Sequence, residues 1–134
     1  MPAPFDVFLV TPEREVWSGQ ATMVVARGTE GEVGILAGHA PMLIQLGIAP
    51  LFIDPADGSE RVAAAVDGGF LHVVTREGQT RVDILAEFAE LRHEINLDRA
   101  RAQQSEAERR IQERDNGTAL AELAKATSRI QLAG

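Results

Sequence analysis

The chain changes character at Ala86, and this change restricts the possible folds more than any other feature of the sequence. Before Ala86, short apolar runs alternate with turn residues such as Thr11-Pro12 and Asp54-Pro-Ala-Asp-Gly58, a pattern typical of strands joined by tight turns. After Ala86, charged and helix-favouring residues take over, and Gly117 is the one glycine before Gly134. We therefore predict two parts, a β-domain over residues 1–86 and an α-helical part over residues 87–134.

The first part has the signals of eight or more short strands. They are residues 5–10, 15–17, 21–27, 42–46, 51–53, 61–66, 70–74 and 81–85. Short strands at such close spacing favour an antiparallel β-sandwich or flattened barrel. Several runs are apolar on both faces, and we expect Trp17 and the phenylalanines to lie in the core.

The second part predicts an antiparallel hairpin of two helices. Asn96 is a good N-cap for the first helix, and Asp98 lies in the first turn, where the helix dipole favours negative charge. Asn116-Gly117 should end this helix, and Thr118 can cap the second. A connection this short makes the two helices neighbours.

One face of each helix is marked by residues at steps of three and four. These faces are Leu97, Ala100, Gln104, Ala107 and Ile111 in the first helix and Leu120, Leu123, Thr127 and Ile130 in the second. They contain few large aliphatic side chains, and contacts between small side chains bury little apolar area. We therefore expect a weakly packed hairpin that can detach from the sandwich.

The stretch from Gly31 to Pro41 is the most restricted part of the backbone. It contains three glycines and a proline around the lone His39, and glycine serves where the chain must adopt φ > 0 or approach another chain closely. This pattern predicts a shaped surface loop between strands. On spacing alone the loop could be either a contact surface or a ligand-binding loop.

The composition excludes several functional classes. The sequence has no cysteine, which rules out disulfides and thiolate metal sites, and its three histidines lack metal-ligand spacing. It has 20 acidic against 13 basic residues, so we expect no nucleic-acid partner. No apolar run approaches the roughly 18 residues that span a bilayer, and there is no signal-peptide pattern. We therefore expect no direct insertion into a membrane.

The residues alone leave three kinds of protein to compare. A small sandwich enzyme would use His39 with Glu30 or Glu32, and an adaptor would place its helices in a partner's bundle. The third is a non-enzymatic sandwich with a detachable hairpin and a specialised loop. We favour it because the serines lie in no G-x-S-x-G context and the glycine-rich stretch lacks the Lys-Ser/Thr pair of a phosphate-binding loop.

Several motifs, in order and at the expected spacing, resemble one family. They are Thr11-Pro-Glu13, Trp17-Ser-Gly19, the stretch from Gly28 to Leu43 that contains Gly-His-Ala-Pro, Val66-Asp-Gly-Gly-Phe-Leu71 and Asp83-Ile-Leu-Ala86. Over nearly its whole length the chain resembles the epsilon subunit of bacterial and chloroplast F-type ATP synthases. One departure is Ala37, where the family commonly has proline.

The resemblance implies an N-terminal β-sandwich, a C-terminal helical hairpin and no catalytic residues. It implies a rotor subunit of the central stalk that couples the ring of c subunits to the catalytic head through the gamma subunit. The implied ring contacts are Glu32, Val33 and His39, and the implied gamma contacts are Thr11, Met42 and Leu43.

In this family the hairpin can extend along gamma and inhibit ATP hydrolysis. Its arginines would then meet acidic segments of the alpha and beta subunits of the head. The lack of a transit peptide favours a bacterial protein, bound peripherally at the cytoplasmic face of the plasma membrane as part of the synthase.

Some members of the family bind ATP through a motif of the form Ile-Asp-x-x-Arg-Ala at the start of the first helix. Here the stretch is Ile95-Asn-Leu-Asp-Arg-Ala100, so Arg99 and Ala100 match and Asn96 replaces the aspartate. Glu90 and Arg129 align with further contacts, and Lys125 replaces an arginine. The resemblance thus implies no required cofactor and a weak regulatory ATP site at Glu90, Asn96, Arg99, Ala100 and Arg129.

Overall fold

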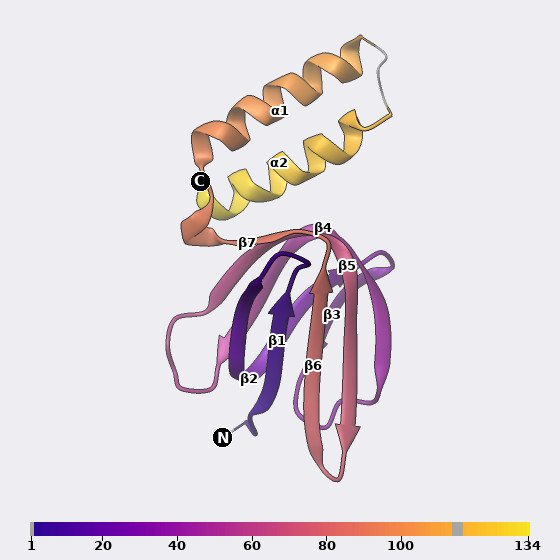
Figure 1. The fold of residues 1–134 in the computed structure, drawn as a ribbon, viewed down its shortest axis with the longest axis vertical. Helices are drawn as coiled ribbons and strands as arrows, with labels where there is room; N and C mark the ends of the chain where they lie inside the picture. Colours follow the sequence, from indigo (N-terminus) through magenta and orange to yellow (C-terminus); the bar gives the residue numbers. More distant parts are fainter. Residues whose placement is uncertain (1, 114–116) are drawn as a thin grey trace.

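The computed structural model describes residues 2–113 and 117–134, and it consists of a β-sandwich followed by two helices (Figure 1). The strands are β1 (Phe5–Val10), β2 (Glu15–Gly28), β3 (Gly31–Ile35), β4 (Met42–Pro55), β5 (Val62–Arg76), β6 (Gln79–Ala86) and β7 (Ala89–Leu91). A 3-10 turn, η1 (Arg92–Glu94), leads to α1 (Leu97–Gln112) and α2 (Ala119–Ala133). The predicted fold class is confirmed.

The sheet closes on itself and thereby forms the flattened barrel. β1 pairs antiparallel with β2 and parallel with β6, so the order β1-β6-β5-β4-β2 returns to β1. β3 extends the sheet beside β2, and β7 pairs with β5. The sheet therefore continues beyond Ala86, up to Leu91.

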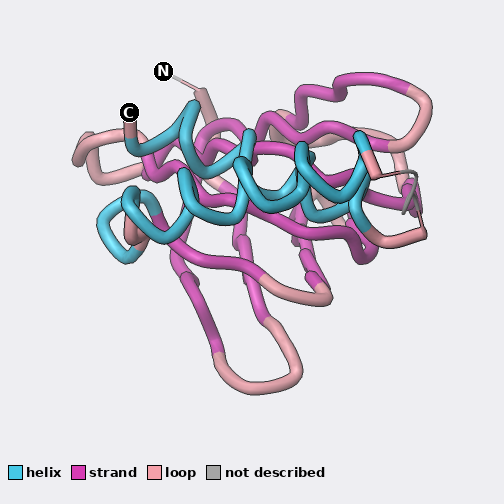
Figure 2. Tube along the Cα trace, turned by 90° about the horizontal axis from the view of Figure 1, so that it is seen from above, coloured by secondary structure: helices cyan, strands magenta, loops and turns pink. Residues whose placement is uncertain are grey.

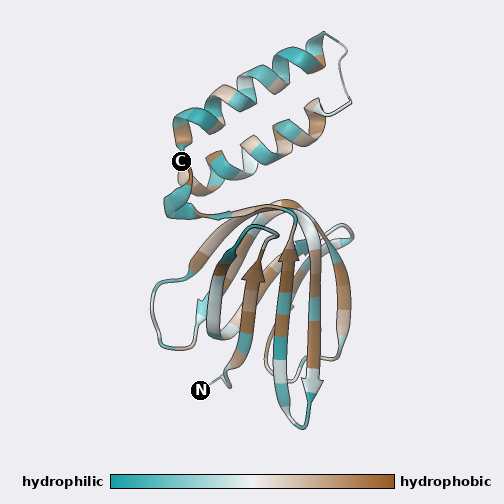
Figure 3. Cartoon of the chain, viewed as in Figure 1, coloured by the Kyte–Doolittle hydropathy of each residue, from teal (hydrophilic) through white to brown (hydrophobic). Residues whose placement is uncertain are grey.

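Alternating side chains of the closed sheet build the core. In β6, for example, Val82, Ile84 and Ala86 are buried while Arg81 and Leu85 are exposed, as the two-residue period of a strand requires. The largest fully buried side chains are Leu9, Ile35, Leu51, Ile53, Leu71 and Ile84. Each such side chain contributes about 1.5–3 kcal/mol relative to an exposed position, and brown bands along the strands in Figure 3 mark the apolar residues of the sheet.

Three strands are longer than predicted, so the expectation of eight or more short strands is wrong. β2 and β5 each have 14 or more residues and each combine two predicted runs, as does β4. Gly69 shows why: its φ is +120°, and a Cβ there would lie 2.2 Å from the carbonyl oxygen of Leu85. The glycine permits a close approach inside a continuous strand, whereas the predicted strands 61–66 and 70–74 stop on either side of it.

The predicted surface loop from Gly31 to Pro41 is only partly a loop. Its first half is β3, which pairs antiparallel with β2, and Ile35 at its end is fully buried. The second half is a turn that connects β3 to β4. The glycines in this stretch therefore serve an edge strand as well as a turn.

The start of the first helix is confirmed at Asn96, whose Oδ1 accepts a hydrogen bond of 3.0 Å from the Arg99 amide. Thr118 stands at the start of α2, but its side chain makes no capping hydrogen bond. Its hydroxyl instead accepts a hydrogen bond from the Arg110 guanidinium. The predicted stop at Asn116 lies outside the described residues, and α1 ends at Gln112.

The two helices pack through alanines. Ala100 and Ala107 of α1 and Ala119 and Ala126 of α2 are buried. The predicted face of α2 is wrong at Leu120, which is 59% exposed, because the alanines take the buried positions. α2 contacts β4 and β5, and Figure 2 shows both helices lying across one end of the sandwich.

Candidate functional site

The outer side of the sheet presents large apolar side chains on neighbouring strands. Leu43, Phe70 and Leu85 are 66%, 49% and 54% exposed. Phe70 lies opposite Leu85, which in turn lies opposite Val10 on β1. Leu43 lies opposite His72 and therefore diagonally to Phe70. We call Val10, Leu43, Phe70 and Leu85 the outer apolar face; exposed apolar side chains gathered in this way mark an interaction site.

The three predicted gamma contacts do not lie together on one exposed surface. Leu43 belongs to the outer apolar face, whereas its neighbour Met42 is half-buried and packs against the core. Thr11 follows β1, and its hydroxyl lies 3.3 Å from both the carbonyl oxygen and the amide of Arg14. The structure therefore brings only Leu43 of these three onto the exposed apolar surface.

Sequence reasoning missed Phe70 and Leu85. The expectation that the phenylalanines lie in the core is wrong for Phe70 and also for Phe88, which is 48% exposed. The alternation along β5 contains the missing signal, because Phe70 shares a face with the polar His72 while Leu71 points inward.

The predicted ring contacts lie on β3 and on the turn after it. Glu32 is exposed opposite Arg27, whereas Val33 packs against the core. Successive residues of a strand point to opposite faces, so Glu32 and Val33 do not share one surface. His39 lies in the turn, where its amide donates to Leu36 and its Nδ1 lies 2.8 Å from the carbonyl oxygen of Ala40.

Two threonines hold this turn against the end of the β5–β6 hairpin. The Gly38 amide donates to Thr80 Oγ1 at 2.7 Å, and Thr75 Oγ1 donates to the His39 carbonyl at 2.9 Å. The two hydroxyls are 3.0 Å apart, and Thr80 is 5% exposed. These contacts give His39 a fixed place on the surface; nothing in the sequence around Thr75 or Thr80 indicates them.

A cleft between the hairpin and the sandwich contains all five residues of the predicted nucleotide site. Its volume is about 420 Å³. It is lined by Glu90, Asn96, Arg99, Ala100 and Arg129, together with Asp67, Phe88, Glu94, Gln103, Glu122 and Lys125. The structure thus brings residues from β5, β7 and both helices to one place.

Arg129 of α2 is the best-connected side chain of the cleft. Its Nη1 and Nη2 donate to the two carboxylate oxygens of Asp67 at 2.9 and 2.8 Å, and its Nε donates to Glu90 at 2.5 Å. Nη1 also donates to the carbonyl oxygen of Lys125 at 3.0 Å. The side chains of Arg129 and Asp67 are only 8% and 6% exposed. Burial disfavours the charged guanidinium, but the hydrogen bonds and charges of Asp67 and Glu90 outweigh it and raise the pKa of Arg129.

The other charged side chains of the cleft make fewer ion pairs than Arg129 does. Glu94 pairs with Arg14 at 2.7 Å, and this hydrogen bond lowers the pKa of Glu94. Lys125 is 3.7 Å from Glu122, and Arg99 makes no ion pair within the described residues. Arg99 and Lys125 are therefore the cations with capacity for an anion, because Arg129 already binds two carboxylates. Sequence reasoning missed Asp67, which lies between the predicted strands 61–66 and 70–74.

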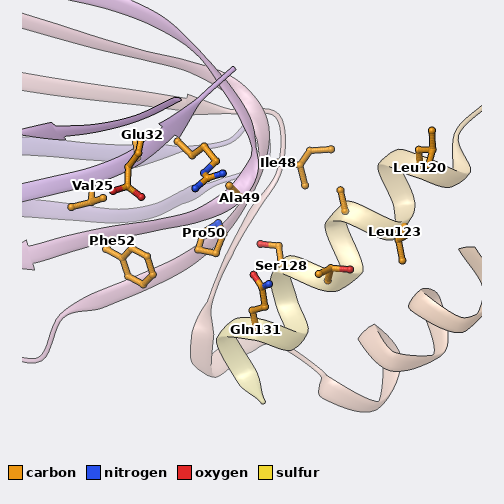
Figure 4. Close-up of a pocket in the computed structure, with 14 residues that line it drawn as sticks. Val25, Glu32, Ile48, Ala49, Pro50, Phe52, Leu120, Leu123, Ser128 and Gln131 are labelled. Carbon is orange, nitrogen blue, oxygen red and sulfur yellow. The ribbon is translucent and has the colours of Figure 1, made fainter. Parts of the chain in front are cut away.

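A second hollow lies between α2 and the sandwich (Figure 4). Its volume is about 650 Å³, and its lining includes Phe52 and Pro50 from β4 and Leu123 from α2. Figure 4 shows Ser128 and Gln131 close to Pro50, while Leu120 lies farther along the helix and away from the strands. The C-terminal half of α2 is thus the part that meets the sandwich.

A metal-binding cluster and a membrane-spanning helix are both absent from the described residues. Over residues 2–113 and 117–134, no group of three or more histidines and carboxylates could hold a metal ion. Within the same residues no helix has the length and apolar character needed to cross a bilayer. Neither the cleft nor the hollow in Figure 4 is lined by His39 or Glu30. Glu32, the other carboxylate of the enzyme alternative, lines the hollow in Figure 4, but His39 does not lie beside it there.

Comparison of the sequence with known families and proteins agrees with these features. Residues 4–92 match the family described as "ATP synthase, Delta/Epsilon chain, beta-sandwich domain". An ATP synthase epsilon chain of Brevibacillus brevis is 47% identical over 108 residues, 81% of this chain and 78% of the relative. One of Thermobifida fusca is 49% identical over 104 residues, 77% of this chain and 74% of the relative.

The fold is also similar to chains in solved assemblies. A chain in the cryo-EM structure of the Euglena gracilis mitochondrial ATP synthase, comprising OSCP, F1 and c-ring, superposes with a TM-score of 0.80 at 25% identity. The match covers 99% of this chain and 82% of the other. A chain from the central stalk and c-ring of the Tetrahymena thermophila enzyme gives a TM-score of 0.50 at 19% identity, covering 69% and 70%, a likeness of fold.

Proposed function

The chain belongs to the family of ATP synthase epsilon chains, and from this membership we propose that it is a non-catalytic rotor subunit of the central stalk. In this role it couples the c-ring to the catalytic head through gamma and restrains ATP hydrolysis through its helical hairpin. It acts at the cytoplasmic face of a bacterial membrane, which it reaches through its partners. The observation that carries the proposal is the outer apolar face, which lies on a closed and well-packed sheet.

Gamma binds the outer apolar face. Leu43, Phe70 and Leu85 are about half exposed or more on three neighbouring strands, and exposed apolar side chains gathered on one surface are typical of a protein–protein contact. Burying them against gamma removes this area from water at about 25 cal/mol per Å². The closed sheet fixes the spacing of the three side chains, so little ordering is needed on binding.

Leu43→Glu in the full chain tests this contact. We expect at least a tenfold loss of affinity for the gamma subunit, since burying an unpaired carboxylate in an apolar contact is costly and about 1.4 kcal/mol corresponds to tenfold. The matched control is Leu120→Glu, which places the same charge at a similarly exposed leucine of the hairpin. Unchanged binding by the Leu43 variant contradicts the assignment of this face, and a wild-type chain that does not bind gamma favours the adaptor alternative.

Two features meet the polar loops of the c-ring: the turn that contains His39, and the exposed Glu32 on β3. Thr75 and Thr80 support this proposal, because they fix the turn without filling it with apolar side chains. Thr80→Val removes the hydroxyl that holds Gly38 but keeps a β-branched side chain. We expect it to weaken retention of the chain by isolated rings while binding to gamma is unchanged; equal retention would argue against a fixed turn as the contact.

The hairpin is the regulatory part. It is held together largely by alanines, and only the C-terminal half of α2 meets the sandwich, so its docking surface is small. Arg101 is exposed on α1, and in an extended hairpin such an arginine can pair with carboxylates of the alpha and beta subunits. Hydrolysis by the assembled enzyme should therefore rise when the hairpin is removed.

The cleft is a second candidate site, for ATP as a weak regulatory ligand. The observation in its favour is that Glu90, Asn96, Arg99, Ala100 and Arg129 line a single cleft. Asn96→Asp restores the aspartate of the family motif and retains a side chain that can cap α1. We expect tighter ATP binding in a calorimetric titration, with Asn96→Ser as a control that caps without the charge. An unchanged affinity would mean that the motif does not form a nucleotide site.

A further inference from the structure

We propose that Asp67, Glu90 and Arg129 form a buried latch that keeps the hairpin docked on the sandwich. The latch joins α2 to β5 across 62 residues of sequence, and it joins α2 to β7 through Glu90. It lies at the end of α2 that meets the sandwich, where Ser128 is also buried. The proposal concerns the docked state of the isolated chain and goes beyond the subunit's place in the assembly.

The Arg129 guanidinium forms a two-point pair with the Asp67 carboxylate. Both oxygens of Asp67 accept from separate nitrogens of Arg129, at 2.9 and 2.8 Å, and the remaining Nε donates to Glu90. Planar guanidinium groups pair with carboxylates in this two-point manner with high directional specificity. The Phe88 ring, 5.6 Å from the guanidinium carbon, covers one side of the group.

The sandwich holds its part of the latch rigidly. The Asp67 amide donates to the Phe88 carbonyl at 2.9 Å, and Asp67 pairs with Ile48 of β4 in the strand register. Glu90 lies on β7, opposite Ala65 of β5. Both carboxylates are therefore presented by paired strands, and only Arg129 moves with the hairpin.

Because the hairpin packs through alanines, the latch determines whether the hairpin stays docked on the sandwich. The buried residues of α2 are Ala119, Ala126, Ser128 and Arg129, none of which is a large apolar side chain. A hollow of about 650 Å³ also separates part of the helix from the strands. Removing one partner of a buried pair leaves an uncompensated charge, which is strongly unfavourable. If the hairpin undocks, Arg129 becomes free to bind carboxylates of another subunit; this last step rests on the proposed function.

Hydrogen exchange in the full chain tests the latch through two variants, Asp67→Asn and Arg129→Gln. We expect each to accelerate exchange of the most protected amides of α2 by at least about tenfold while β4 and β5 remain protected. The double variant should exchange no faster than either single variant, because both remove the same interaction. The matched control is Asp54→Asn, which breaks a two-point pair with Arg61, at 2.6 and 3.1 Å, that lies within the sandwich.

Each other outcome overturns the proposal. Unchanged exchange of α2 in either single variant shows that the pair does not hold the hairpin. Additive effects in the double variant show that the two residues act separately. Equal acceleration in β4 and β5, or the same effect from Asp54→Asn, indicates general destabilisation. The measurement needs no partner, so it can fail while inhibition of the assembled enzyme stands, and the reverse.

Discussion

At the scale of the residue, Gly69 makes the long strand β5 possible. Its φ is +120°, and an added Cβ would lie 2.2 Å from the Leu85 carbonyl oxygen and 2.8 Å from the Ala86 Cα. Both obstacles are backbone atoms of the neighbouring strand, so neither can rotate away. The position therefore combines an unfavourable backbone conformation with a steric overlap.

We predict that Gly69→Ala lowers the free energy of unfolding by about 3 kcal/mol or more, since strain at special dihedrals alone costs about 1–3 kcal/mol. Urea unfolding of the full chain measures it. Gly58→Ala is the control, because Gly58 has a φ of +81° but no atom within 4 Å of an added Cβ. Equal losses in the two variants would mean that the overlap at Gly69 is relieved by movement of β6.

Asp67 shows why part of the site could not be predicted from the sequence. Its partner lies 62 residues away, and no local pattern announces a pair at that separation. Asn96 was predictable because an N-cap interacts with its own helix three residues on. Leu43 was implied by the resemblance to the family, whereas Phe70 required the phase of its strand to be known.

At the scale of the element, η1 ties the first turn of the sandwich to the hairpin. Glu94 accepts from the Leu91 amide at 2.8 Å and from Arg14 at 2.7 Å. The hydrogen bond from Arg14 is the main reason that the pKa of Glu94 is lowered. A lowered pKa in the folded state stabilises the protein above the unfolded value of about 4.3. This stabilisation is lost as the pH falls through the lower folded value.

We predict that Arg14→Ala raises the pKa of Glu94 toward its ordinary value and reduces the acid dependence of stability. An NMR titration of the Glu94 carboxyl carbon measures the first effect, and unfolding between about pH 3 and pH 6, a range that spans the ordinary carboxylate pKa, measures the second. Arg61→Ala, which removes the partner of Asp54, should leave Glu94 unchanged. A Glu94 titration that does not move in the Arg14 variant would show that the ion pair is not formed in solution.

The elements differ in how far the sequence determines them. The helices were predicted well at the start of α1 because capping is a local interaction. The strands were predicted too short because Gly47 and Gly68-Gly69 resemble terminators, although the strand pairing continues on both sides of them. The face of α2 was misjudged because close packing against α1 selects alanine over leucine at the buried positions.

At the scale of the whole molecule, β7 belongs to the sandwich although it follows the change at Ala86. Ala89 is 2% exposed, and Ala89, Glu90 and Leu91 lie opposite Val66, Ala65 and Ala64 of β5. The closed fold and the family could be predicted because they rest on the pattern of the entire chain. The C-terminal boundary of the sandwich is harder to predict, since it depends on a short strand with no alternation of its own.

We predict that a chain ending at Ile95 unfolds cooperatively. A chain ending at Ala86 should have a melting temperature several degrees below that of the longer chain. The shorter chain loses the β7 ladder and leaves one edge of β5 unpaired from Ala64 to Val66, while the other edge stays paired with β4. A thermal melt followed by circular dichroism compares the two, and about 1 kcal/mol corresponds to roughly 4–8 °C for a domain of this size. Equal melting temperatures would show that β7 adds nothing to the sandwich.

The closure of the sheet has a mechanical consequence. β1 joins β2 to β6, so the ring of strands has no seam at which it can open one hydrogen bond at a time. A sideways load on Leu43 or Phe70 is therefore shared among several ladders that must yield together. The sandwich should deform little under such a load, and the elastic part of the chain should be the hairpin, which the proposed latch of Asp67, Glu90 and Arg129 helps to fasten to it.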